Sequence, residues 1–257
     1  MMRTLRVVLT VGAVALAAVG CGNDTEPASD GTVSGTVTVF AAASLTETFT
    51  ALGEKFEAEH PGTDVVFNFG GSSSLAEQIE QGAPVDVFAS AAPKNMQQVV
   101  DAGEVTAEPV VFVRNRLEIA VPTGNPGGIT GLADFAEPEQ TIALCAEQVP
   151  CGAAAQKVFD AARIIPQPDT RETDVKAVLT KVSLGEVDAG LVYRTDVQAA
   201  GDKVEGIEFP ESGAVVNDYP IAPLAVAPNA ATAAAFVEFI GSDTARAVFA
   251  EAGFDTP

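Results

Sequence analysis

The segment that decides the fold is residues 65–79, which read VVFNFGGSSSLAEQI. Its first five residues are mostly β-branched or aromatic and predict a strand. Two glycines and three serines follow, and an amphipathic run then predicts a helix. A similar junction lies upstream, where residues 37–40 precede small residues and a helical pattern from Leu45. Strands that alternate with helices in this way predict an α/β fold with mixed, mostly parallel sheets.

The same alternation continues from residue 36 to the C-terminus. Strands are expected at residues 37–40, 65–69, 85–89, 117–121, 141–144, 189–193 and 221–226. Helices are expected at residues 45–59, 75–81, 94–102, 153–162, 175–184, 231–240 and 244–252. Two of the strands, near residues 116–121 and 218–226, are expected to cross between two lobes. We therefore expect a first lobe of residues 36–118 plus 223–257, a second lobe of residues 119–222, and a ligand cleft between them.

The N-terminal residues predict export. Two arginines precede an uncharged run at residues 7–19, whose 13 residues suit the core of a signal peptide and are too few to span a membrane. Cys21 follows small residues and resembles the lipidated cysteine of bacterial lipoproteins, exposed when residues 1–20 are removed. Residues 21–35 are then a lipidated N-terminus and a flexible tether. This predicts a lipid anchor at the outer face of the cytoplasmic membrane; an ordinary secretory signal with an incidental cysteine is the alternative.

The composition excludes several classes of function. Lys and Arg number 14 against 35 Asp and Glu, and the formal net charge is −21 at pH 7. A surface for nucleic acid or anionic lipid is therefore not expected. His60 is the only histidine, which excludes His-based zinc sites and leaves little for Ser-His or Cys-His catalysis. With no hydrolase or nucleotide-binding motif present, we expect no enzyme, no cofactor and no directly coordinated metal.

Four helix starts favour the capture of a small anion. They lie near residues 41–45, 70–75, 149–153 and 172–175, in both expected lobes. Helix N-termini carry unpaired backbone N–H groups and positive dipole ends, and serine hydroxyls add donors. Because α/β sheets bind ligands at such junctions, we expect the four starts to converge on one cleft.

Helix capping is the alternative explanation for some of these residues. Ser44 and Ser74 each lie three residues before a glutamate and fit a capping box, in which the serine needs no ligand. We assign Ser74 to this role, which leaves Ser72 to face a ligand beside two glycines that allow close backbone approach. Asp174 is expected to cap the helix that follows it.

The motifs resemble the periplasmic molybdate-binding proteins of ABC importers. The resemblance covers the chain from about residue 37 to residue 254, in order and with matching spacings. Its motifs are FAAASL (residues 40–45), FGGSSSLA (69–76), QGAPVDVF (81–88), VPCG (149–152), DV (174–175), DAGLVY (188–193) and YPI (219–221). The resemblance implies a two-lobed periplasmic-binding-protein fold of type II. It further implies a monomer that passes molybdate, and also tungstate, to the transmembrane permease of an ABC transporter.

Carried over residue by residue, the family's oxyanion contacts fall on Ser44, Ser72, Cys151, Val175 and Tyr193. The two serines would supply hydroxyl and backbone N–H donors, Cys151 and Val175 backbone N–H groups, and Tyr193 its phenol. Position 151 is commonly a small residue such as alanine in this family, and a main-chain contact tolerates cysteine there. Without the resemblance, Tyr193 would be interpreted as a core residue whose hydroxyl is satisfied.

The donor set also implies a selectivity. Molybdate and tungstate are fully ionised dianions that only accept hydrogen bonds, whereas phosphate keeps a proton at neutral pH and needs an acceptor. None of the five contacts is acidic, so hydrogen phosphate should be rejected. Binding of another small oxyanion such as sulfate is the main alternative. An Fe(III) binder and a purely structural lipoprotein explain the converging donors less well.

Cys145 and Cys151 are expected to form a disulfide. Five residues separate them, in a chain that is expected to reach an oxidising compartment. Two free thiols are the alternative, since two cysteines and one distant histidine cannot complete a soft-metal site. The bridge would close a short loop directly before a ligand-bearing helix.

Overall fold

The computed structural model describes residues 32–257. The expected signal peptide, Cys21 and most of the tether therefore lie outside the described residues. The strands are β1 (Gly35–Ala42), β2 (Thr63–Gly70), β3 (Val87–Ala89), β4 (Val110–Pro122), β5 (Ile142–Cys145), β6 (Thr170–Glu172), β7 (Ala189–Tyr193), β8 (Val204–Ile207) and β9 (Val216–Pro223). The α-helices are α1 (Thr46–Glu59), α2 (Ser72–Glu80), α3 (Pro93–Asp101), α4 (Pro150–Ala162), α5 (Val175–Ser183), α6 (Arg194–Ala200), α7 (Ala230–Ile240) and α8 (Asp243–Glu251). Short 3-10 helices are η1 (Ala43–Leu45), η2 (Leu132–Ala136), η3 (Gly201–Lys203) and η4 (Pro210–Ala214).

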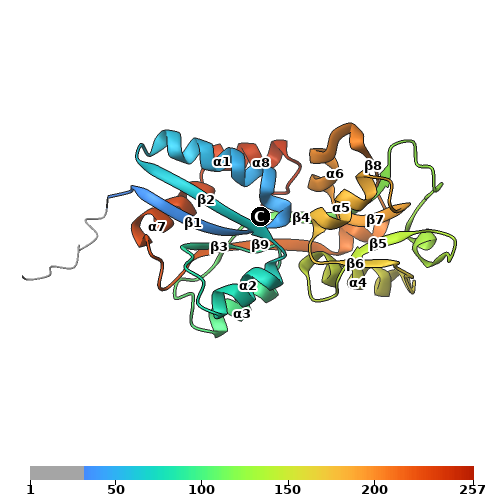
Figure 1. The fold of residues 1–257 in the computed structure, drawn as a ribbon, viewed down its shortest axis with the longest axis horizontal. Helices are drawn as coiled ribbons and strands as arrows, with labels where there is room; N and C mark the ends of the chain where they lie inside the picture. Colours follow the sequence, from blue (N-terminus) through green and yellow to red (C-terminus); the bar gives the residue numbers. More distant parts are fainter. Residues whose placement is uncertain (1–31) are drawn as a thin grey trace, which may run out of the picture. The chain divides into compact units, whose positions relative to one another are not determined.

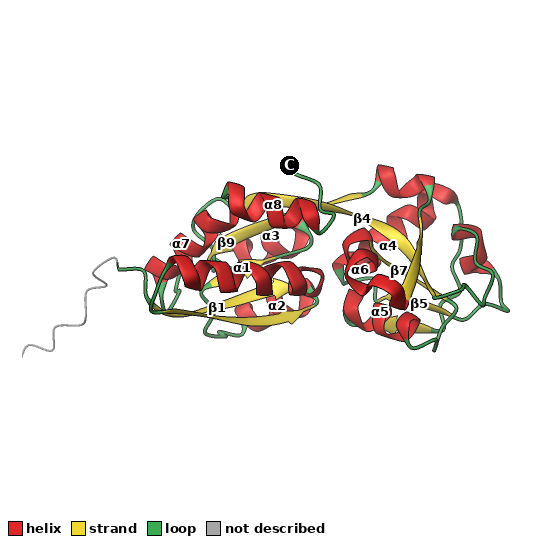
Figure 2. Ribbon diagram, turned by 90° about the horizontal axis from the view of Figure 1, so that it is seen from above, coloured by secondary structure: helices red, strands yellow, loops and turns green. Residues whose placement is uncertain are grey.

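The strands form a mixed sheet in the order β2-β1-β3-β9-β4-β7-β5-β6, with β8 paired to β4. Two groups are parallel, β2-β1-β3 and β6-β5-β7. The long strand β4 runs antiparallel to β9 as far as Arg116 and to β7 from Leu117 onward. Figures 1 and 2 show β4 passing from one group to the other. This change of partner defines a first lobe of residues 32–116 and 216–257 and a second lobe of residues 117–215.

Each lobe has its own hydrophobic core. In β1, Val37 and Val39 face a cluster that contains side chains of α1, α7 and α8, whereas Phe40 faces a second cluster with α2. This follows from the alternation of side chains along a strand, and Figure 1 shows α1 and α2 on opposite sides of the sheet. The core of the second lobe draws its buried residues from positions 117–209, joined by Ala43 of the first lobe. Each sheet group is thus covered on both faces.

Helix α1 shows how the sequence produces this packing. Leu45, Phe49, Leu52 and Phe56 recur at helical spacing and are all 0% exposed. A stripe of this kind holds a helix to a sheet through the burial of apolar surface. The expected helical face at residues 45–59 is therefore confirmed.

The expected return to the first lobe was placed too late. Strand β9 begins at Val216 and pairs with β3 and β4, so residues 216–222 belong to the sheet of the first lobe and not to the second. Its first residues, VNDY, lack the apolar run that signals a strand. Strands β6 and β8 and helix α6 were not expected either; β6 and β8 have only 3 and 4 residues and lie at sheet edges.

Candidate functional site

The four expected helix starts meet around one small pocket. The space between its lining residues is about 200 Å³ when the part that is open to solvent is included. Its lining residues come from the ends of β1, β2 and β7, the residues after β3, and the starts of α2, α4 and α5. They are Ala42, Ala43, Ser44, Gly70, Gly71, Ser72, Ala91, Val149, Pro150, Cys151, Asp174, Val175 and Tyr193.

All five residues predicted to contact an oxyanion line this pocket. Ser44 and Ser72 come from the first lobe, and Cys151, Val175 and Tyr193 from the second. Ser72, Cys151 and Val175 lie in the first turns of α2, α4 and α5, where backbone N–H groups have no acceptor within the helix. The expected convergence of donors from both lobes is therefore met, while their contact with a ligand stays a prediction.

The three side-chain hydroxyls of the site are buried and hydrogen-bonded. Ser44 Oγ lies 2.9 Å from Tyr219 Oη, and Ser72 Oγ accepts from the backbone N–H of Ala91 at 3.0 Å. Burial, reinforced by Tyr219 and Asp196, raises the pKa of Tyr193 well above its usual value. The Tyr193 phenol therefore keeps its proton and remains a hydrogen-bond donor. Neither Ala91 nor Tyr219 was predicted to have this role, although Tyr219 belongs to one of the quoted motifs.

The two expected capping boxes do not form. The N-cap of helix α1 is Leu45, whose side chain has no polar atom, and the Ser44 hydroxyl is hydrogen-bonded to Tyr219 instead. Helix α2 begins three residues earlier than expected, with Gly71 at its N-cap, so Ser74 lies in the first turn and does not cap it. Asp174 does cap α5, since its Oδ1 accepts from the Ala177 N–H at 3.0 Å.

Asp174 is also the one acidic residue among those that line the pocket. None of the five predicted contacts is acidic, and Asp174 was expected to act only as the cap of its helix. Its carboxylate is engaged by the helix that it caps. A carboxylate so placed is nevertheless an acceptor near the ligand, and the binding experiment must therefore include phosphate.

The expected disulfide between Cys145 and Cys151 is present, with the two Cα atoms 5.8 Å apart. It joins the end of β5 to the first turn of α4. The loop between them is tightly packed, since a Cβ on Gly152 would lie 2.0 Å from the carbonyl oxygen of Ala146. The bridge thus holds the backbone around Cys151 beside the pocket.

Replacing both cysteines with alanine should lower the melting temperature and weaken ligand binding modestly. The cross-link stabilises the fold by about 2.4 kcal/mol on the loop-entropy estimate, and its loss leaves the loop less preorganised. Selectivity among oxyanions should survive because no backbone donor is removed. Calorimetry and thermal melting measure both effects. Complete loss of binding in a folded double variant would contradict the assignment of Cys151 as a backbone donor.

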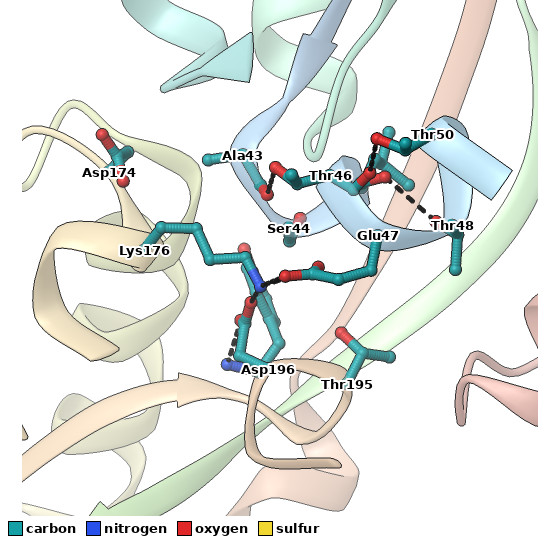
Figure 3. A network of polar contacts seen from close by, with 12 residues as sticks. Ala43, Ser44, Thr46, Glu47, Thr48, Thr50, Asp174, Lys176, Thr195 and Asp196 are labelled. Carbon is teal, nitrogen blue, oxygen red and sulfur yellow. Dashed lines mark hydrogen bonds and ion pairs between the residues drawn. The ribbon is translucent and has the colours of Figure 1, made fainter. Parts of the chain in front are cut away.

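An ion-pair network joins the lobes beside the pocket (Figure 3). Lys176, next to Val175 on α5, lies 2.9 Å from the carboxylate of Glu47 on α1 and 3.0 Å from that of Asp196 on α6. The second oxygen of Asp196 accepts from the Tyr193 N–H at 3.0 Å. The network therefore lies beside three of the predicted ligand contacts: Ser44 in the first lobe, and Val175 and Tyr193 in the second.

The charges in this network depend on one another. Burial raises the pKa of the Asp196 carboxyl, an effect that Lys176 opposes. Burial alone would lower the pKa of Lys176, but Asp196 and Glu47 outweigh it and raise the pKa above its usual value. Lys176 therefore stays charged, and its cation compensates the buried carboxylate.

A larger, open cavity of about 360 Å³ lies where β4 crosses between the lobes. Its charged lining residues are two arginines and two glutamates, Arg116, Arg194, Glu118 and Glu208. Burial, and then the nearby Glu208, raise the pKa of Glu118. Charges of both signs in an open cavity do not form a set of donors for one anion, so the smaller pocket is the better candidate. Across residues 32–257, no group of three or more His, Cys, Asp and Glu side chains could hold a metal ion.

Known proteins are similar to this chain over most of its length. Residues 37–255 match the family model of the bacterial extracellular solute-binding proteins. The chain is 40% identical over 242 residues to the molybdate-binding protein ModA of Mycobacterium tuberculosis, with 93% of each chain covered.

Two solved structures support the fold. The periplasmic molybdate-binding protein of Azotobacter vinelandii gives a TM-score of 0.72 at 21% identity, covering 86% of this chain and 99% of that one. The sulfate-binding protein SubI from Mycobacterium tuberculosis gives a TM-score of 0.76 at 19% identity, covering 86% of each chain. They share a mixed α/β architecture typical of periplasmic binding proteins, as expected from the sequence.

Proposed function

Because the chain belongs to the bacterial extracellular solute-binding proteins, we propose that it captures molybdate outside the cytoplasm and delivers it to an ABC importer. The observation that carries this proposal is the convergence of donors from both lobes on one pocket, whose lining includes all five residues predicted to contact the anion. The ModA relative supports molybdate as the ligand. Binding and release, rather than catalysis, is the activity of such a protein.

The chemistry of the pocket suits a fully ionised tetrahedral dianion. Such an anion only accepts hydrogen bonds, and the pocket offers backbone N–H groups at helix starts together with protonated hydroxyls. A charge-assisted hydrogen bond contributes about 1.5–3 kcal/mol. Several of them support a dissociation constant of about 1 µM or lower. Tungstate has the same charge and shape, and we propose that it binds as well.

Sulfate is the second candidate ligand. Its charge pattern equals that of molybdate, and the fold is shared with a sulfate-binding protein. Isothermal titration calorimetry with molybdate, tungstate, sulfate and phosphate separates the two proposals. Molybdate and tungstate should bind tightly, sulfate weakly and phosphate least of all. Tighter binding of sulfate than of molybdate would refute the molybdate proposal.

Ser72→Ala should weaken molybdate binding by about 1–3 kcal/mol, because a donor that faces a dianion is lost. Ser74→Ala is the matched control from the same helix turn. Ser74 is exposed to solvent, and its hydroxyl lies near only Gln78 Nε2, at 3.4 Å. Its replacement should leave the affinity almost unchanged. An equal loss of affinity in the two variants, measured by calorimetry, would show that Ser72 is not a specific contact.

We also propose that the protein acts as a monomer tethered to the membrane by lipid on Cys21, with the following residues as a flexible spacer. No helix within residues 32–257 is long and apolar enough to cross a membrane. The family supports a location outside the cytoplasm. A tether of this kind would keep the binding domain near the transmembrane permease that receives its ligand.

A further inference from the structure

Asn217 contacts pocket residues of both lobes. It lies on β9 near the crossing between the lobes, opposite Asn115 of β4. Its Nδ2 donates to the carbonyl oxygen of Ala91 at 3.0 Å and to Tyr193 Oη at 2.8 Å. Ala91 and Tyr193 both line the pocket, one from each lobe.

The chemistry of the partners fixes the orientation of this amide. A backbone carbonyl oxygen only accepts hydrogen bonds, so the atom that faces Ala91 must be the nitrogen of the Asn217 side chain. That nitrogen has two hydrogens, one for each partner. The Tyr193 hydroxyl therefore accepts from Asn217, and its own proton must point to a different acceptor.

Two acceptors compete for the Tyr193 proton. One is the hydroxyl of Tyr219, which also interacts with Tyr193. The other is an anion in the pocket, which is the stronger acceptor because hydrogen bonds to a charged group are about twice as strong as neutral ones. With Asn217 in place, the phenol turns its proton from Tyr219 to a bound anion while it keeps the hydrogen bond that it accepts from Asn217.

The other contact of Asn217 leads to Ser72. The Ala91 peptide accepts from Asn217 through its own carbonyl, and its N–H donates to Ser72 Oγ at 3.0 Å. Ser72 is 1% exposed, and its oxygen is engaged as an acceptor, so its proton is also available to the pocket. One amide thus supports a hydroxyl donor from each lobe.

We propose that Asn217 is a positioning residue that fixes the Tyr193 and Ser72 hydroxyls as donors and so selects oxyanions that carry no proton. The inference rests on the proposed function of the pocket. A fully ionised anion accepts both protons, whereas hydrogen phosphate brings an O–H that meets another donor. Asn217 would influence the choice of ligand without touching it.

The test measures the affinity for molybdate by calorimetry and that for phosphate by competition, in the full-length protein. Asn217→Ala should reduce the affinity for molybdate about tenfold, since the supporting hydrogen bonds are lost. The ratio of the phosphate and molybdate dissociation constants should fall as well, which a general loss of stability would not produce. Asp218→Ala is the control, because Asp218 is the next residue on β9 and bonds to Arg114 rather than to the pocket. Asp218→Ala should leave both the affinity for molybdate and this ratio unchanged.

A double-mutant cycle with Tyr193→Phe shows whether Asn217 acts through the phenol. In the Tyr193→Phe background, Asn217→Ala should reduce the affinity for molybdate by about threefold or less, because the effects of substituting residues that act together are not additive. Full additivity, or a wild-type affinity ratio in Asn217→Ala, would overturn the inference while leaving the proposed function intact. Failure of the wild-type protein to bind molybdate would overturn both.

Discussion

Lys176→Met is expected to lower the free energy of unfolding by about 3–5 kcal/mol, because it leaves a buried carboxylate without its cation. The side chain of Asp196 is 0% exposed, and Lys176 Nζ lies 3.0 Å from it. The loss measures the cost of an uncompensated buried charge, not a net gain from the ion pair. Urea denaturation followed by circular dichroism determines the change.

Lys181→Met on the same helix is the matched control. Lys181 pairs at 3.8 and 3.5 Å with Glu172 and Glu186, and neither of these carboxylates is fully buried. Its replacement should cost less than about 1 kcal/mol. Adding Asp196→Asn to Lys176→Met should recover part of the lost stability, because the unpaired charge is removed. A loss in Lys176→Met no larger than in Lys181→Met would contradict this account.

Gly71→Ala should weaken molybdate binding about 100-fold while leaving the stability of the ligand-free protein nearly unchanged. A Cβ at Gly71 would lie 2.4 Å from the carbonyl oxygen of Thr173, which is backbone of the second lobe. Ordinary contact requires about 3.5 Å, so the lobes would be held about 1 Å further apart. Loss of two donors at about 1.5 kcal/mol each accounts for the expected factor.

Gly70→Ala is the comparison in the same loop: Gly70 also lines the pocket, but no backbone of the second lobe lies within 4 Å of a Cβ there. A Cβ there would meet only the Leu75 side chain, at 3.6 Å, which is normal contact. Because the donors come from both lobes, ligand should close the cleft by a hinge motion at β4 and β9. X-ray scattering should show that molybdate reduces the radius of gyration of the wild-type protein and of Gly70→Ala, but not that of Gly71→Ala. Equal affinity in the two glycine variants would rule out the close approach as a requirement for binding.

The parts of the site that could be predicted are those with a local cause. A strand that ends in small residues before a helix is visible in the sequence, and Ser72, Cys151 and Val175 indeed lie in the first turns of helices. Asp174 caps α5 as expected because an N-cap depends only on its own helix. The disulfide could be predicted because only five residues separate Cys145 from Cys151 and the chain is expected to reach an oxidising compartment.

The parts that were missed depend on contacts between distant segments. Ser44 fits a capping box by spacing, yet its hydroxyl is hydrogen-bonded to Tyr219, which lies 175 residues away in sequence. Asn217 reaches Ala91 only because β9 pairs antiparallel with β3 in the middle of the sheet. No pattern within the segment around residues 216–219 reveals that pairing. Lys176 likewise gives no signal of a partner on α1.

The position of β9 in the chain has a consequence for how the protein matures. The second lobe is one continuous segment, so all of its strands are available once residue 215 has emerged. The sheet of the first lobe lacks a central strand until β9 arrives, and its core also needs α7 and α8 from the last residues of the chain. Pairings between such distant segments form slowly. During export, the first lobe therefore begins to emerge first but completes its folding last. Until β9 pairs with them, the edges of β3 and β4 stay unpaired and are exposed to cellular quality control.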